Sequence, residues 1–177
     1  MRSIALTAFV VFAAASPLAA QSEDVLFGLR AGVVDVSGFD VGDATIDTDL
    51  SPSIGGFFDF GFGPLSAGVY ADVHGLTGEF DDREYMLDAG AALKASLGGL
   101  GSRAYLRPGV GVGYGTVDVG DGATFLTTRG TLEVVVPQAG GMSWVFEGGA
   151  YWAPTGDADG TDVEFGPGLL LRAGIQF

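Results

Sequence analysis

The sequence has no cysteine, one histidine and only eight lysine and arginine residues among 177 residues. Without cysteine, the chain can form no disulfide framework and offers no thiolate ligand to a metal. The eight basic residues are outnumbered by 22 acidic ones, which gives a formal net charge of −14. Because nucleic-acid binding relies on lysine and arginine contacts to phosphates, this balance argues against a nucleic-acid partner.

Long apolar runs are also missing, except at the N-terminus. Arg2 is followed by an apolar and small-residue run over 4–15, and the segment 17–20 offers small residues at a cleavage point before Gln21. This pattern predicts a secretory signal peptide over 1–20 and a single domain over 21–177. A retained membrane helix is the alternative, but the run 4–20 is short and has no basic stop-transfer flank. No later stretch reaches 18 apolar residues, whereas a membrane-spanning β-strand needs only ~9–11 residues.

No segment carries a sustained helical stripe, and alternation of apolar with polar or small residues dominates instead. Clusters of Gly, Pro, Asp and Ser separate eight alternating segments, which is typical of β-strands. The segments are 25–36, 53–61, 65–77, 85–97, 103–117, 123–136, 142–153 and 165–177. Pro108 and Pro167 fall inside these patterns and predict bulges, because proline removes a ladder hydrogen bond.

The connections between these strands alternate between two kinds. Three are tight and uncharged, at 62–64, 98–102 and 137–141, and four are longer or acidic, at 37–50, 78–84, 118–122 and 154–164. The four acidic connections hold 14 of the 22 acidic residues. Short turns at one end and longer loops at the other are typical of an up-and-down membrane barrel. We therefore predict an all-β fold, an eight-stranded antiparallel up-and-down transmembrane β-barrel.

Charged residues of the strands keep to one face, except Asp35, which has the apolar parity and is expected at the outer rim. Alternate side chains of a strand point to opposite faces, and no strand core divides its charges between the two. An eight-stranded barrel has an interior just wide enough for side chains, and buried charges need partners, so we predict a filled, ion-paired interior. Its expected members are Arg30, Asp59, Asp72, His74, Asp88, Lys94, Arg103, Arg107, Arg129, Glu133, Glu147 and Arg172.

The opposite face is apolar and carries aromatic residues near both ends. We expect belts at headgroup depth, where an amphipathic ring suits both media. They comprise Phe27, Phe62, Trp144 and Phe177 at the turn end, and Tyr85, Tyr114, Trp152 and Phe165 at the loop end. A soluble lipocalin-like barrel is the alternative, and it would need this apolar face inside.

The last strand ends on an aromatic residue at the C-terminus. Its apolar face comprises Leu169, Leu171, Ala173, Ile175 and Phe177. This ending, the leader, the eight strands and the acidic loops together resemble small outer-membrane barrels of the OmpA/OmpX type and opacity-type, porin-like barrels. The resemblance implies a monomer in the outer membrane of a Gram-negative-type bacterium, surrounded by lipid and lipopolysaccharide. It also implies that the barrel-assembly machinery reads the terminal strand.

Candidates for chemistry are few. Lipid A deacylases use a His-x-Ser pair, but Gly75, Leu76 and Thr77 follow the only histidine, His74, so the serine is missing at that spacing. Four carboxylates, those of Asp157, Asp159, Asp162 and Glu164, lie within eight residues and have the oxygen-rich composition that Ca²⁺ prefers. A solvated acidic loop is the simpler interpretation of this segment, and divalent bridging to lipopolysaccharide phosphates is a third.

No cofactor is expected. The sequence favours a non-enzymatic envelope or surface barrel over two alternatives, a narrow transport barrel for small or apolar solutes and a lipid A-modifying enzyme.

Overall fold

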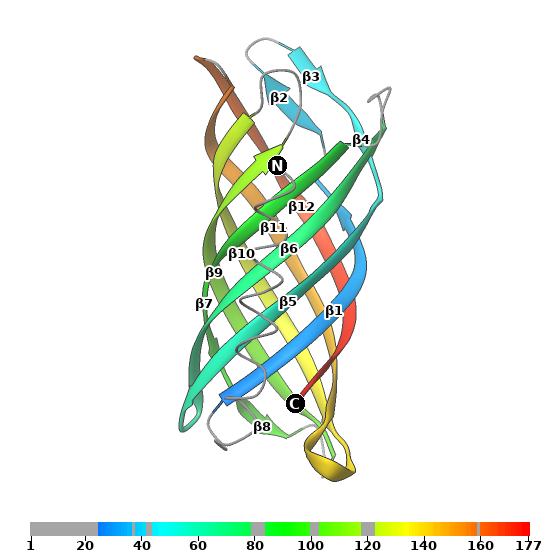
Figure 1. Cartoon of the computed structure of the whole chain (residues 1–177), viewed down its shortest axis with the longest axis vertical. Coiled ribbons are helices and arrows are strands. Elements are labelled where there is room, and N and C mark those ends of the chain that lie inside the picture. Colours follow the sequence, from blue (N-terminus) through cyan, green and yellow to red (C-terminus); the bar gives the residue numbers. More distant parts are fainter. Residues whose placement is uncertain are drawn as a thin grey trace, which may run out of the picture.

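The computed structural model describes residues 25–36, 38–41, 44–78, 84–99, 103–117, 123–158 and 160–177. The expected leader, 1–20, lies outside these ranges. Eight long strands form the body of the described chain (Figure 1). They are β1 (Val25–Asp35), β5 (Ser51–Phe62), β6 (Leu65–Gly78), β7 (Glu84–Ala95), β9 (Tyr105–Val117), β10 (Ala123–Pro137), β11 (Ser143–Ala158) and β12 (Thr161–Gln176).

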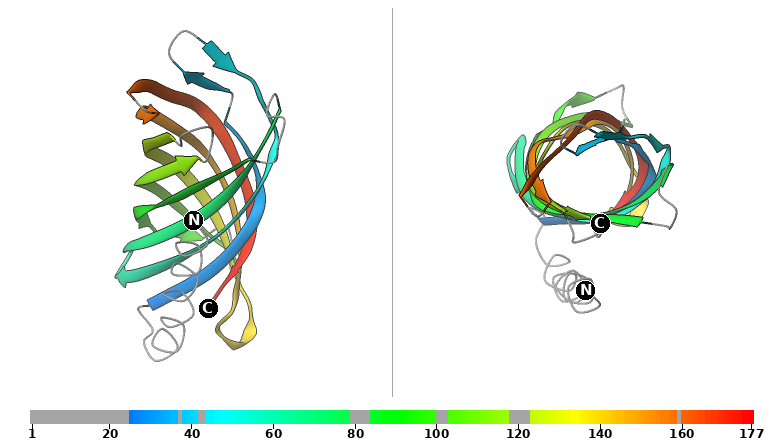
Figure 2. Two further views of the ribbon diagram at one scale, coloured as in Figure 1. Left: turned by 45° about the horizontal axis from the view of Figure 1, so that its top comes forward. Right: turned by 90° about the horizontal axis from the view of Figure 1, so that it is seen from above.

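The sheet closes on itself. Each long strand pairs antiparallel with the next one along the chain, and β1 also pairs with β12. Leu29 of β1, for example, lies opposite Gly56 of β5 on one side and Ile175 of β12 on the other. Seen from above, the strands form a ring (Figure 2). The expected all-β up-and-down barrel is confirmed.

The two ends of the barrel differ. The short turn between β5 and β6, the small strand β8 (Leu97–Gly99) and the 3₁₀ turn η1 (Ala139–Gly141) lie at the end that holds the C-terminus (Figure 1). At the opposite end lie β2 (Phe39–Val41), β3 (Ala44–Ile46) and β4 (Thr48–Asp49), all within the first expected loop. The predicted alternation of connections is therefore present.

The first and fourth loops contain more strand than expected. β2 pairs with the upper part of β12 and β3 pairs with β2, so a small hairpin extends the wall above the rim. β11 and β12 continue past the expected limits of 153 and 165 and pair Asp157 with Asp162. The predicted bounds of the fourth acidic connection, 154–164, were therefore wrong. Gly160, at φ 84°, lies in the tight turn that joins the extended ends of β11 and β12.

A bulge interrupts the pairing of β11 and β12. Tyr151 lies opposite Gly168, but the next paired residues are Ala153 and Phe165, so β12 spends one residue more than β11 on this step. An extra residue reverses which face the following side chains occupy. Gly166 lies within the bulge at φ 116°, a conformation that suits a residue without a side chain.

The barrel reverses the usual distribution of polarity. Large apolar side chains such as Ile54, Leu93 and Val110 are exposed on the outer face, while charged side chains such as Arg107 and Glu133 are buried inside. Among the described residues, no helix is both long and apolar enough to cross a membrane.

Candidate functional site

The interior of the barrel gathers ten charged residues of the long strands. Inward positions of all eight strands contribute, because alternate residues of each strand face the same way. Five cations and five anions are buried there: Arg30, Lys94, Arg107, Arg129 and Arg172, with Asp59, Asp72, Asp88, Glu133 and Glu147. The equal numbers allow each buried charge to have an opposite neighbour, which burial in a low-dielectric interior requires.

Asp72 lies at the centre of one half of this network. Its carboxylate accepts contacts from Arg172 Nη1 at 2.7 Å and Arg129 Nη1 at 2.6 Å, and Arg30 Nη2 lies 3.5 Å away. The second amino group of Arg129 contacts Asp88, which also accepts a hydrogen bond from Thr127 Oγ1 at 2.7 Å. Side chains from five strands therefore come together around the carboxylates of Asp72 and Asp88.

Glu147 and Glu133 organise the other half. Arg172 donates two hydrogen bonds to Glu147, from Nε and Nη2 at 3.0 Å each, in the bidentate geometry that makes such pairs strong. Arg30 Nη1 also lies 3.0 Å from Glu147. Glu133 contacts Arg107 Nε and lies 3.1 Å from Lys94 Nζ.

Asp59 and Gln176 extend this half toward the turn end. Lys94 Nζ donates to Asp59 Oδ2 at 2.8 Å, and Arg107 Nη2 donates to the Gln176 side-chain carbonyl at 2.8 Å.

Two aromatic rings, those of Phe57 and Tyr70, contact the buried cationic groups in place of water. The ring of Phe57 has Lys94 Nζ at 4.2 Å from its centre, with the guanidinium groups of Arg30 and Arg107 at 5.3 and 5.7 Å. The guanidinium carbon of Arg129 lies 3.5 Å from the centre of the Tyr70 ring. Cation–π contacts of this kind are strongest when desolvated, as here. The rings therefore help to offset the loss of water.

Glycines in the wall make room for these long side chains. A Cβ at Gly113 would lie 2.3 Å from the Tyr70 hydroxyl, and one at Gly55 would fall within bonding distance of Asp72. On the outer face, by contrast, a Cβ at Gly130 would meet nothing within 4 Å. The inward glycines therefore leave the space that the side chains of the charged network occupy.

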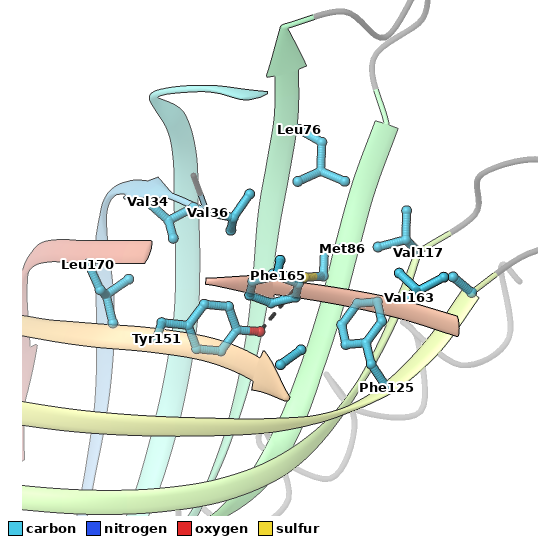
Figure 3. Packing of buried hydrophobic residues seen from close by; sticks show 12 residues of the cluster. Val34, Val36, Leu76, Met86, Val117, Phe125, Tyr151, Val163, Phe165 and Leu170 are labelled. Carbon is cyan, nitrogen blue, oxygen red and sulfur yellow. Dashed lines mark hydrogen bonds between the residues drawn. The ribbon is translucent and has the colours of Figure 1, made fainter. Parts of the chain in front are cut away.

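Toward the loop end the interior is apolar, and Figure 3 shows how its buried side chains pack. Tyr151, Phe125 and Phe165 pack ring against ring, with centres 5.3 and 5.4 Å apart for the two contacts made by Phe165. The remaining members of this apolar plug are Val34, Val36, Leu76, Met86, Val117, Ala123, Ala153, Val163 and Leu170. The plug was not predicted from the sequence. The alternation of residues along each strand predicts which side chains point inward. It does not predict which of these inward side chains form an apolar layer and which form a charged layer.

Two residues do not lie where the sequence predicted them. Phe165, expected in the outer aromatic belt, is only 4% exposed and belongs to the plug. The bulge reverses the alternation of β12 between Gly168 and Phe165, so counting back by twos from the C-terminus fails at this point. Arg103, expected in the interior network, is exposed and precedes the first residue of β9, Tyr105. Counting by twos from Arg107 gives Arg103 an inward direction, but Arg103 lies outside β9 and therefore beyond the end of the barrel wall.

The other belt residues lie at the outer surface. Phe62, Tyr85, Tyr114, Trp144, Trp152 and Phe177 are exposed, and Phe27 is half-buried because its ring stacks on that of Phe177 at 5.2 Å. In the terminal strand, Leu169 and Leu171 are 68% and 65% exposed, whereas Leu170 between them is 3% exposed. Ala173 is also exposed, and Ile175 is half-buried.

His74 has a serine neighbour that the sequence analysis missed. Ser53 lies directly opposite it across β5 and β6, and its hydroxyl is 2.9 Å from His74 Nδ1. The two residues are 3% and 1% exposed, and the His74 ring packs against Tyr151 of the plug. The pairing comes from strand register and not from sequence spacing, so a search for a local motif could not find it.

Among the described residues, one cluster has metal-ligand chemistry: Asp72, His74 and Asp88, whose ligand atoms lie within 4.8 Å of one another. Arg129 already contacts both carboxylates, so a metal cation there would have to compete with a buried guanidinium. In the acidic segment, Asp157 and Asp162 are exposed, and Asp157 Oδ1 accepts a hydrogen bond from the Gly160 amide at 3.2 Å. Asp159 and the side chain of Glu164 lie outside the described residues.

No family model and no curated protein sequence matches the chain. Several solved structures match, two of which are small barrels. Neisserial surface protein A is 12% identical, with a TM-score of 0.57 over 87% of this chain and 96% of that chain. Ail, the attachment invasion locus protein of Yersinia pestis, is 12% identical, with a TM-score of 0.46 over 87% of this chain and 99% of that chain. The fold is that of small outer-membrane barrels.

Proposed function

We propose that the protein is an integral outer-membrane barrel of a Gram-negative-type bacterium, with a non-enzymatic role in the envelope or at the cell surface. One observation carries the proposal: the outer face is apolar and exposed around the ring, while five cations and five anions are buried inside. Such a continuous apolar surface is unfavourable in water and favourable in hydrocarbon. A soluble lipocalin-like carrier needs the reverse arrangement.

The filled interior favours this role over transport. A cavity of about 10 Å³ lies among Arg30, Asp59, Tyr70, Lys94 and Arg129, and it has room for about one water molecule. The apolar plug lies between the network and the loop end. We therefore expect no stable ion conductance from the purified protein in planar bilayers, and steady conductance steps would favour the transport alternative.

The burial of His74 favours the non-enzymatic role as well. Nucleophilic catalysis needs a serine, a base and an orienting group that a substrate can reach. Ser53 and His74 are buried beside the plug, where His74 lies opposite Met86, so a lipid outside the barrel does not reach them. Expression of the His74→Ala variant should leave the lipid A profile unchanged relative to the wild-type protein. A changed profile would favour the enzyme.

The proposed location in the outer membrane also determines which partners we expect. Lipid and lipopolysaccharide would contact the outer face of a monomer, and the acidic loops would face the exterior. The barrel-assembly machinery would read the terminal strand, whose exposed Leu169, Leu171 and Phe177 suit recognition at the edge of the closing sheet.

Fractionation of cells tests the proposal directly. The protein should appear in outer-membrane fractions and should migrate differently on a gel before and after boiling, because a folded barrel resists detergent until it is heated. Recovery as a soluble periplasmic protein would contradict the proposal.

A further inference from the structure

The small cavity inside the barrel lies between the two halves of the charged network. Residues of β1, β5, β6, β7, β9, β10 and β11 line its volume of about 10 Å³. The lining includes Arg129, which contacts Asp72 in one half, and Lys94, which contacts Asp59 in the other half. These side chains are buried, so a molecule in the cavity is enclosed by the protein.

Two guanidinium groups that line the cavity each keep one N–H donor unused. Arg30 and Arg129 place their terminal nitrogens on carboxylates: Nη1 of Arg30 lies 3.0 Å from Glu147, and Nη1 of Arg129 lies 2.6 Å from Asp72. The Nε atoms of both residues are buried and have no hydrogen-bond partner among the described residues. A buried donor without a partner is unfavourable, so these two N–H groups call for an acceptor.

A water molecule suits this lining better than an anion does. Its oxygen can accept from the two Nε–H groups, and its hydrogens can be donated to Asp59 and Glu147, the two carboxylates that line the cavity. An anion would accept from the same donors but would lie beside two negative charges. Buried water molecules typically make about three hydrogen bonds to groups that otherwise lack partners, and a cavity of this size has room for about one.

We propose that the cavity binds one water molecule, held by the two guanidinium groups and the two carboxylates, and that this water joins the two halves of the network. The apolar plug closes the interior toward the loop end. Toward the turn end, the hydrogen bond from Arg107 to Gln176 connects opposite sides of the ring. The water is therefore a single enclosed molecule that exchanges slowly with solvent, and it is not part of a water path across the barrel.

The arginine side chains make the site measurable by NMR. In isotope-labelled protein folded in deuterated detergent micelles, nuclear Overhauser cross-peaks to the water resonance report on each Nε–H group. Arg30 and Arg129 should each show a cross-peak with the sign of a water molecule that tumbles with the protein. Arg107 and Arg172 provide matched controls, because their Nε–H groups donate to carboxylates. Their cross-peaks should be absent or several-fold weaker.

Filling the cavity provides a second test. Ala92 lines the cavity, and its neighbour Ala91 is exposed on the outer face of the same strand. Ala92→Val should remove the cross-peaks of Arg30 and Arg129, because the added methyl groups displace the water, whereas Ala91→Val should leave both unchanged. Heat-modifiable migration verifies that the two variants fold.

Hydroxyl protons that exchange with solvent could produce similar cross-peaks. Tyr70 and Thr131 also line the cavity, and each carries a hydroxyl group. Tyr70→Phe and Thr131→Val should each keep the cross-peaks of Arg30 and Arg129. Their loss in either variant would assign them to proton exchange and would overturn the site.

Absence of the cross-peaks of Arg30 and Arg129 would also overturn the site, and the unaltered protein decides this even if Ala92→Val does not fold. Cross-peaks of equal strength at all four arginines would mean that water permeates the network, which contradicts a single enclosed molecule. Replacing chloride with bromide in the buffer should leave the Nε–H resonances in place, and a shift confined to Arg30 and Arg129 would identify an anion instead of water.

Discussion

The pair formed by Lys94 and Asp59 tests whether the interior is held together by matched charges. Lys94 Nζ lies 2.8 Å from Asp59 Oδ2 and 3.1 Å from Glu133 Oε1. The only other cation near Asp59 in the described interior is Arg107, whose Nη1 is 3.8 Å away. Two unit charges 2.8 Å apart attract by about 6 kcal/mol at an effective dielectric constant of about 20. Desolvation opposes most of this attraction, so the pair adds little net stability while both members are present.

Removing one member leaves the other charge buried without its main partner. Asp59→Asn and Lys94→Met should therefore each lower the free energy of unfolding by about 3–5 kcal/mol. The double variant should lose less than the sum of the two, by about 1–3 kcal/mol, because it buries no unmatched charge at this site. Urea unfolding in lipid vesicles, followed by tryptophan fluorescence, measures all four proteins. Single variants that each cost under about 1 kcal/mol, or strictly additive losses, would refute the reasoning.

Three further predictions concern packing, lipid contact and assembly. Gly113→Ala should destabilise the barrel by about 1–3 kcal/mol by overpacking against Tyr70, whereas Gly130→Ala, with open space, should change the unfolding midpoint little; equal effects would contradict the packing role. Val110→Arg, near the middle of β9 on the outer face, should cost about 2–4 kcal/mol in vesicles, and a neutral effect would mean that this face meets water. Phe177→Ser removes the stacking on Phe27 and should slow appearance of the heat-modifiable form in cells, and unchanged kinetics would show that assembly does not depend on this ring.

Alternation alone predicted the fold and most of the interior network. Arg30, Lys94 and Arg107 could be placed because a period of two fixes the facing of a whole strand once one residue is assigned. The same rule failed for Phe165, since one extra residue in a bulge reverses every residue beyond it. It also failed for Arg103, because parity gives the direction of a side chain but not where the wall ends.

Partners across strands were beyond the reach of the sequence. The contact of Ser53 with His74 depends on the register of β5 against β6, and that of Gln176 with Arg107 joins strands that lie far apart in the chain. The apolar plug was missed for a related reason. The tilt and register of the strands decide at which height along the barrel each inward side chain lies. They therefore decide whether an inward Val or Leu contacts a charged residue or another apolar one.

The odd-numbered residues of the terminal strand are expected to face lipid. Because the chain has no cysteine, single-cysteine variants at Leu169 and Leu171 can carry a nitroxide label at these sites alone, with Gln138 in the exposed turn as the aqueous reference. In vesicles, labels at Leu169 and Leu171 should collide often with dissolved oxygen and rarely with a water-soluble nickel chelate. Collisions with the chelate as frequent as those at Gln138 would contradict the account.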